Sequence, residues 1–415
     1  MSLTNLRKRI NRSHTTTMLF SGCAMFLVAS VIVYPEEAFK ASLKGLSIWW
    51  EVLLPAQLPF FIIAELLIGF GVVHFLGVLL EPFMRPIFRV PGSGSFVMAV
   101  GLTSGNPIGA KLTSRLREQG LISRTEGERL VSFTSTAGPL FMFGTVAVGF
   151  FHDAKVGIIL ASVHYLSNFL VGFLMRFHEP DGPTTPAIQS GKGFILVRAL
   201  RAMHRARIGD GRTLGQLLSD AVVSSVNTCL MIGGFLVFFS VMISMLTVIH
   251  LTDWLASFMA ALLHLIGLPA ILGQGIVPGL LEITLGAQAI SVMPSHVPLR
   301  YQLAACNAII AWSGLSIHAQ VASLLSRTDI RYLPYLLARV LHGMLAFLLT
   351  LALWDPLEKQ LSRMLIIPAF LHLSPQSGWG LWWMYLIGLG WLAFISLLVM
   401  GCCSFLIHWF RRAKP

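Results

Sequence analysis

Long apolar stretches separated by short charged segments dominate the hydropathy pattern of this chain. A helix needs about 20 mainly apolar residues to cross a bilayer core about 30 Å thick, and runs of this length recur along the sequence. The pattern predicts an all-α polytopic membrane protein with about eight transmembrane helices. We place these spans at about residues 18 to 34, 45 to 70, 131 to 151, 154 to 176, 215 to 248, 302 to 325, 331 to 354 and 380 to 408.

Two further apolar stretches, about residues 75 to 110 and 252 to 293, are interrupted by glycine and proline. Glycine permits turns and proline removes a backbone donor, so both residues break helices. Non-helical backbone survives at membrane depth only inside protein or beside a water-filled cavity. We therefore predict a broken or re-entrant helical hairpin over each stretch. The interrupting residues are Pro86, Pro91, Gly92, Gly94, Gly101, Gly105 and Pro107 in the first stretch, and Gly267, Pro269, Gly273, Gly275, Pro278, Gly279 and Gly286 in the second.

The two interrupted stretches belong to an internal repeat. An offset of 177 residues sets Gly109 over Gly286, and an offset of 178 sets His164 over His342. Each half then holds a long span, a broken hairpin and two more spans. Because each unit contains an odd number of full crossings, we expect two inverted repeats. This plan is typical of secondary transporters, which bind substrate near the midplane at the repeat interface, although a duplication kept for packing in a channel or scaffold is the alternative.

This organisation divides the chain into five segments. They are an N-terminal cytoplasmic tail with the first span (1–40), a first repeat (41–176), a basic cytoplasmic loop (177–213), a second, inverted repeat (214–355), and an outer amphipathic segment with the last span and a basic C-terminal tail (356–415).

Charge and composition orient the protein and exclude several functions. Only 12% of the 415 residues are charged, against about a quarter in soluble domains. Lysine and arginine concentrate in the segments that face the cytoplasm when both termini lie inside, and this bias accounts for the net charge of +12 without nucleic acid binding. The five cysteines and thirteen histidines lack metal-ligand spacing, so no metal or cofactor is expected. Without a nucleophile and base or a metal site, an enzyme is not expected either.

The polar residues at the interruptions are the candidate binding site. The run from Thr103 to Lys111 reads TSGNPIGAK, and its bared amides and the Asn106 side chain are expected to hold a polar solute. A helix that begins near Ile108 would direct the positive end of its dipole to this point, which favours an anion. Lys111 either adds a full charge or is simply the first cytoplasmic lysine.

Other polar positions leave two interpretations open. Glu282, an acid in an apolar stretch, either carries a proton or ligates a cation or solute, or else bonds the freed amides of its own hairpin. The hydroxyls of residues 132–136 either face the solute or repair a proline kink, and His164, Asn168, Arg339 and His342 either line the cavity or form interhelical hydrogen bonds. The predicted substrate-binding residues are Ser104, Gly105, Asn106, Pro107, Gly109, Lys111, Thr134, Ser135, Thr136, Gly138, Glu282, Thr284, Gly286, Gln288, Asn307, Ser313, Gly314 and Ser316.

The segment SGNPIGAKLTSRLREQGLISRTEGERLVSFTSTAGPLFMFGTVAVGFF resembles the signature of the YlbJ (SpoVV) type of sporulation integral membrane proteins. That family belongs to the Gate, or nucleoside-recognition-domain, group, which is distantly similar to concentrative nucleoside transporters. The resemblance covers roughly residues 40 to 355. It implies a multi-pass protein of the mother-cell-derived outer forespore membrane that passes dipicolinic acid, a small planar dianion, toward the forespore during endospore formation.

Two classes of function follow from the residues and the resemblance together. The first is a transporter of a small anionic solute, with dipicolinate as the leading substrate and a nucleoside or other small polar solute as the runner-up. The second is a sporulation membrane scaffold that does not transport. The expected partners are the lipid bilayer and the solute, and the sequence is also compatible with a coupling ion or proton, a homo-oligomer or a sporulation partner.

Overall fold

The structure is a computed structural model that describes residues 18, 21–22, 24–186 and 194–362. Every element assigned in this part of the chain is a helix. Within the predicted first span, 18 to 34, the structure has an apolar helix at Ala24–Val33. The predicted last span, 380 to 408, lies outside the described residues.

The first half of the fold runs from a helix that begins at Pro35 to a long helix that ends at Met175. Its elements are α2 (Pro35–Ile48), the π-helical turn η1 (Trp49–Leu53), α3 (Leu54–Gly69), α4 (Val72–Phe88), α5 (Gly94–Ser104), α6 (Ile108–Glu118), α7 (Arg124–Thr134), η2 (Leu140–Phe150) and α8 (Ala154–Met175).

The second half begins after the basic loop. Its elements are α9 (Ile195–Asp210), α10 (Leu214–Val248), α11 (Leu251–Leu265), the short η3 (Ala270–Leu272), α12 (Gly273–Leu281), α13 (Ile283–Ser291), α14 (Leu299–Trp312), α15 (Gly314–Leu325) and α16 (Tyr332–Ser362).

Four helical segments of the described residues are long and apolar enough to cross a membrane: Ala154–Met175, Leu214–Val248, Leu299–Leu325 and Tyr332–Lys359. They coincide with four of the predicted spans. A fifth is reached if Phe61–Gly69 and Val72–Phe88, which meet at 83°, are counted as one bent span. The predicted span at 131 to 151 is instead divided into α7 and η2 around residues 135–139, so the count of eight full spans stays a prediction.

The predicted hairpin over residues 75 to 110 begins too early. The chain turns sharply at Gly71, whose φ is +79°, and α4 forms a separate helix before the hairpin starts. The hairpin itself consists of α5 and α6, joined at residues 105–107. Its second arm, α6, is amphipathic and buries Ile108, Leu112 and Leu116, which explains why the apolar stretch in the sequence ends near residue 110 although the arm continues to Glu118. The predicted hairpin over residues 252 to 293 likewise begins too early, because α11 is a separate helix and the hairpin itself consists of α12 and α13.

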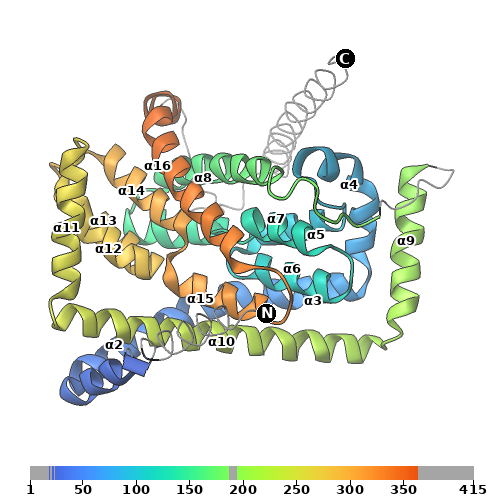
Figure 1. Cartoon of the computed structure of the whole chain (residues 1–415), viewed down its shortest axis with the longest axis horizontal. Helices are drawn as coiled ribbons and strands as arrows, with labels where there is room; N and C mark the ends of the chain where they lie inside the picture. The colour runs from blue at the N-terminus through green and yellow to red at the C-terminus, as the bar shows by residue number, and fades with distance from the viewer. Residues whose placement is uncertain (1–17, 19–20, 23, 187–193, 363–415) are drawn as a thin grey trace, which may run out of the picture.

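The order of elements is the same in both halves. A long helix (α3, α10) is followed by a peripheral helix (α4, α11), a broken hairpin (α5–α6, α12–α13), two short helices in tandem (α7–η2, α14–α15) and another long helix (α8, α16). In Figure 1, α10 runs along the long axis of the molecule, α4 and α9 stand at one end of it, and α11 stands at the other.

The outer surface of α16 is apolar and its inner face is polar. Leu333, Leu337 and Met344 are each about 60% exposed, whereas Arg339 and His342 are fully buried. In water this arrangement would be unfavourable on both faces, because apolar side chains would be exposed to solvent while charged and polar groups would lose their hydration. The same arrangement suits a lipid environment, so the fold is that of an integral membrane protein.

Two apolar clusters hold the helices around this polar interior. One surrounds Phe61, Phe96 and Phe133 and joins the first-half helices to α10. The other surrounds Ile159, Ile290 and Ile310 and joins η2 and α8 to the second hairpin and α14.

Candidate functional site

The two breaks of the first half lie directly against each other. The chain leaves α5 at Gly105, whose φ is +83°, passes a cis peptide bond between Asn106 and Pro107, and enters α6. A Cβ atom placed on Gly105 would lie 2.7 Å from the backbone nitrogen of Gly138, which belongs to the break between α7 and η2. Only glycine therefore permits this approach.

The two breaks of the second half meet in the same way. Gly314 has a φ of +67°, and a Cβ atom on it would lie 3.2 Å from the backbone nitrogen of Ile283, between α12 and α13. At this break Glu282 is buried and caps α13, because its carboxylate accepts hydrogen bonds from the Leu285 amide at 2.9 Å and the Thr284 hydroxyl at 3.1 Å. Of the two interpretations of Glu282, its contacts are those of the structural one.

The breaks of the two halves join through Asn106. Its side-chain nitrogen donates to the Ser313 hydroxyl at 3.3 Å, and its side-chain oxygen accepts from the Ser135 hydroxyl at 2.8 Å. The Tyr335 hydroxyl lies within interaction range of both serines, yet it is buried and makes no hydrogen bond of regular geometry. We call Asn106, Ser135, Ser313 and Tyr335 the central junction.

A chain of buried polar contacts extends from the next residue of the first-half break. Thr136 bonds His164 at 2.7 Å, and the other nitrogen of the His164 ring lies 3.3 Å from the side-chain oxygen of Asn307. Asn307 in turn donates to the Thr350 hydroxyl at 3.1 Å. The rings of His164 and His342, which the repeat offset aligns, are 4.7 Å apart. The Thr136 hydroxyl is thus engaged within the first half, whereas the Asn307 side chain connects the two halves through His164.

Arg339 is a fully buried cation beside the central junction. One guanidinium nitrogen donates to the carbonyl oxygen of Ser132 and to the Asn168 side chain, and the guanidinium lies 5.7 Å from the centre of the Tyr335 ring. Its Nε and Nη1 atoms have no hydrogen-bond partner among the described residues. All 18 acidic residues of the chain fall within the described ranges, and none of the ion pairs formed there involves Arg339.

Lys111 does not reach the central junction. Its ammonium lies 2.9 Å from the Glu65 carboxylate and donates to the Ser224 hydroxyl at 3.1 Å, so its charge is neutralised between α3, α6 and α10. Glu65 and Ser224 also line a cavity of about 240 Å³ together with Arg115, Arg212, Leu217, Asp220 and Ala221. The expectation that Lys111 adds a free charge to the solute site does not hold in this conformation.

Several other predicted site residues serve packing. The Thr134 hydroxyl bonds the Leu130 carbonyl of its own helix at 2.8 Å. Gly109 and Gly286 allow close approach, since a Cβ atom on them would lie 2.1 Å from the Thr134 carbonyl oxygen and 2.2 Å from the Cα atom of Gly279, respectively.

Three further predicted residues are distributed differently. Gln288 is exposed, away from the junction. The Ser316 hydroxyl accepts a long hydrogen bond from Gln320 at 3.5 Å. Ser104, the last residue of α5, has a buried hydroxyl without a partner in the part of the chain that the structure describes, so it remains available next to the first-half break.

Sequence reasoning did not select Tyr335 and left Arg339 among several possible interhelical contacts. The signal was present, because Tyr335, Arg339, His342 and Thr350 are spaced by 4, 7 and 15 residues and therefore share one face of a helix. Reading residues 332–354 by helical period, instead of by hydropathy, would have shown this polar stripe within an otherwise apolar span.

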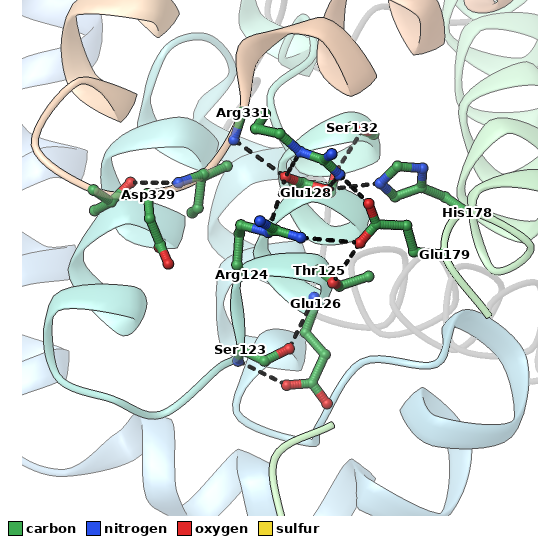
Figure 2. A network of polar contacts seen from close by, with 12 residues as sticks. Ser123, Arg124, Thr125, Glu126, Glu128, Ser132, His178, Glu179, Asp329 and Arg331 are labelled. Atoms are coloured by element: carbon green, nitrogen blue, oxygen red, sulfur yellow. Dashed lines mark hydrogen bonds and ion pairs between the residues drawn. The ribbon is translucent and has the colours of Figure 1, made fainter. Parts of the chain in front are cut away.

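A second polar cluster lies between the start of α7, the loop after α8 and the loop before α16 (Figure 2). Glu128 is buried and accepts from Arg331 at 2.7 Å and from His178 at 2.7 Å. Glu179 is bonded to Arg331 and accepts from Thr125 at 3.0 Å. The hydrogen bond from Arg331 is the largest of the effects that lower the pKa of Glu179 to about 2. We call Glu128, His178, Glu179 and Arg331 the ion-pair cluster.

The ion-pair cluster also has a geometry that could hold a metal ion, since ligand atoms of Glu128, His178 and Glu179 lie within 4.8 Å of one another. Both carboxylates, however, are already engaged by Arg331, and a cation would have to compete with that guanidinium. The ion-pair cluster therefore connects the first half to the start of α16.

Comparison with known proteins places these features in a family. Residues 50–153 match the Gate family, described as nucleoside recognition, and this range contains both first-half breaks. The chain is 28% identical over 131 residues to an uncharacterised protein of Alkalihalophilus pseudofirmus, covering 31% of this chain and 28% of that protein. It is 50% identical over 349 residues to the sporulation integral membrane protein YlbJ of Bacillus subtilis (strain 168), covering 84% of this chain and 85% of that protein. Because this identity extends over most of both sequences, the chain belongs to the YlbJ family of sporulation integral membrane proteins.

Proposed function

We propose that this protein is a membrane transporter of a small anionic solute, dipicolinic acid, during endospore formation, and that the solute is held at the central junction. One observation carries the proposal: each half of the chain is broken twice, and Asn106 of one half bonds Ser313 of the other where the breaks meet. Broken helices in the middle of a membrane protein are where transporters expose backbone dipoles to their substrates.

The proposal includes an inverted relation between the two halves. Two observations support it. The equivalent peripheral helices α4 and α11 stand at opposite ends of the molecule (Figure 1), as expected if the second half is turned over. The equivalent residues His164 and His342 contact each other, which is expected of residues near a pseudo-two-fold axis between the halves. Both termini would then lie in the cytoplasm, as the distribution of lysine and arginine predicts.

The electrostatics of the breaks favour an anion. The helices α6, η2 and α15 begin at the breaks without a side-chain cap, so the partial positive charge of their first amides is not satisfied by the protein's own side chains. Glu282, the acid at these breaks, is committed to the amides of α13. A planar dicarboxylate such as dipicolinate would accept hydrogen bonds from Asn106 and the serine hydroxyls at the same point.

The present conformation keeps the central junction closed. Asn106 uses its amide to bridge Ser135 and Ser313, so a solute must replace these protein contacts when it binds. We propose that the protein acts in the mother-cell-derived outer forespore membrane. Its membership of a sporulation family of integral membrane proteins supports the coarser statement, a membrane of the sporulating cell.

Uptake of labelled dipicolinate into liposomes that contain the purified protein tests the proposal. We expect uptake above that of empty vesicles, inhibited by excess unlabelled dipicolinate and reduced by Asn106→Leu. Uptake equal to that of empty vesicles, by protein that is folded and correctly inserted, would overturn it. A scaffold would instead be indicated if Asn106→Leu left sporulation intact while changes in the 177–213 loop abolished it.

A nucleoside is the second candidate substrate, because the first half matches a family described as nucleoside recognition. A bound ligand raises the unfolding temperature according to its affinity, so uridine and dipicolinate can be compared directly. Stabilisation by uridine alone would favour the nucleoside. Stabilisation by dipicolinate alone is the result we expect, because a neutral nucleoside leaves the charge of Arg339 without a counterion.

A further inference from the structure

We infer that Arg339 is the residue that gives the solute site its preference for anions, through a direct contact with a carboxylate of the solute. This inference rests on the proposed function and extends it to the residue that determines specificity. It is carried by the burial of Arg339, by its two nitrogen atoms without a partner among the described residues, and by the absence of any aspartate or glutamate paired with it there.

A buried guanidinium without a counterion is expensive in lipid or protein. Arg339 receives partial compensation from the Ser132 carbonyl, at the negative end of the α7 dipole, and from the face of the Tyr335 ring. These contacts leave Nε and Nη1 unsatisfied. All aspartate and glutamate residues of the chain lie in the described ranges and none pairs with Arg339, so a bound anion is the counterion that we infer.

The surroundings of Arg339 indicate where that molecule lies. Tyr335 precedes Arg339 by one helical turn, and its buried hydroxyl lies within interaction range of Ser135 and Ser313 of the central junction. Ser104, beside the first-half break, has a further buried hydroxyl without a partner among the described residues. A small carboxylate that bridges Arg339 and the junction would accept hydrogen bonds from the free Arg339 nitrogens and from the Tyr335 and Ser104 hydroxyls, and the planar fork of arginine suits a carboxylate geometrically.

Arg129 shows what a structural arginine looks like in the same fold. It is also buried, with 1% of its surface exposed. Its guanidinium nitrogens, unlike those of Arg339, are satisfied by the backbone carbonyls of Arg89, His178 and Glu179. Arg129 is therefore a matched control, because its replacement removes a buried guanidinium without touching the central junction.

The test compares binding of charged and neutral isosteres to detergent-purified protein. Dipicolinate, benzoate and the neutral pyridine-2,6-dicarboxamide are titrated against wild type, Arg339→Gln, Arg339→Lys and Arg129→Gln, and affinity is measured by calorimetry or thermal shift. We expect wild type and Arg129→Gln to prefer a carboxylate over the diamide. Arg339→Gln should lose this preference by about tenfold or more, as for a lost charge-assisted pair. Arg339→Lys should retain part of it, because the charge remains without the fork.

The ratio of affinities is the decisive quantity, since it does not depend on how much each substitution destabilises the fold. An unchanged ratio in Arg339→Gln would overturn the inference, and so would failure of the wild type to bind either carboxylate. Transport is judged separately by the liposome assay. Carboxylate binding that depends on Arg339 but is accompanied by no flux would support this inference and refute the transport function. Flux with an unchanged ratio would do the reverse.

Discussion

Gly105 offers the sharpest test of the contact between the breaks of the first half. Its φ of +83° and ψ of −170° fall in a region that is essentially restricted to glycine. A side chain there costs about 1 to 3 kcal/mol in backbone strain alone. In Gly105→Ala the new Cβ would also lie 2.7 Å from the backbone nitrogen of Gly138, and backbone cannot rotate away as a side chain can. Overpacking of this kind costs about 1 to 3 kcal/mol more.

Two other glycines separate these effects. Gly120 also has a positive φ, +67°, but a Cβ atom on it would meet no other atom within 4 Å, so Gly120→Ala isolates the strain. Gly234 is an exposed residue of α10 with open space around it, and Gly234→Ala should be neutral or stabilising because alanine favours helix. We expect the loss of stability to rank Gly105→Ala first, Gly120→Ala second and Gly234→Ala last.

The assay is the unfolding midpoint of each detergent-solubilised variant, together with dipicolinate uptake by liposomes. A destabilisation of about 2 kcal/mol corresponds to a decrease of about 2 °C in a chain of about 400 residues that unfolds as one unit. Uptake should fall in Gly105→Ala even at temperatures where the variant is fully folded, since separating the breaks displaces Asn106. If Gly105→Ala melts and transports like Gly234→Ala, the breaks do not touch as described and the reasoning fails.

Three further predictions concern the junction and the ion-pair cluster. Asn106→Leu removes two buried hydrogen bonds and should cost about 2 to 4 kcal/mol and most of the uptake; an unfolding midpoint and a flux both equal to wild type would contradict it. Glu128→Gln and Arg331→Gln should each destabilise the protein but be strongly non-additive in the double variant, because they share one ion pair, and additive losses would count against a direct interaction. The hydrogen bond from Arg331 lowers the pKa of Glu179 to about 2 from an ordinary value of 4.5, so the stability that this group contributes is present above about pH 4.5 and lost as pH falls toward 2. In Arg331→Gln the unfolding midpoint should depend less steeply on pH between about 4.5 and 2 than in the wild type. An equally steep dependence in the variant and the wild type would refute the role given to the Arg331–Glu179 hydrogen bond.

The sequence predicted one break in each half and missed the other. Glycine and proline mark the breaks of the two hairpins, at residues 105–107 and at Glu282, because their restriction is local to the backbone. The second break of each half, at residues 135–139 and at Ser313, lies inside the predicted full spans 131 to 151 and 302 to 325. Neither α4 nor α11 was predicted as a separate element, and the direction of α4 depends on an 83° bend rather than on hydropathy.

The site was predicted only in part, because residue type does not determine partners. Asn106, Ser135 and Ser313 were selected as candidates, and the structure brings them together. Lys111 and Glu282 were selected for their charge, yet Lys111 pairs with Glu65 and Glu282 caps its own helix. In both cases a tertiary or local contact satisfies a group that looked available in the sequence.

What the sequence by itself determined is the position of the two broken hairpins and the lipid-facing character of the surface, since both follow from local chemistry. Only the tertiary structure decided that Asn106 meets Ser313 across 207 positions and that Arg339 is buried against Tyr335 with no carboxylate of the described residues paired with it. Contacts over such separations depend on how whole helices pack, and packing is fixed by the sum of many weak apolar contacts rather than by any single residue.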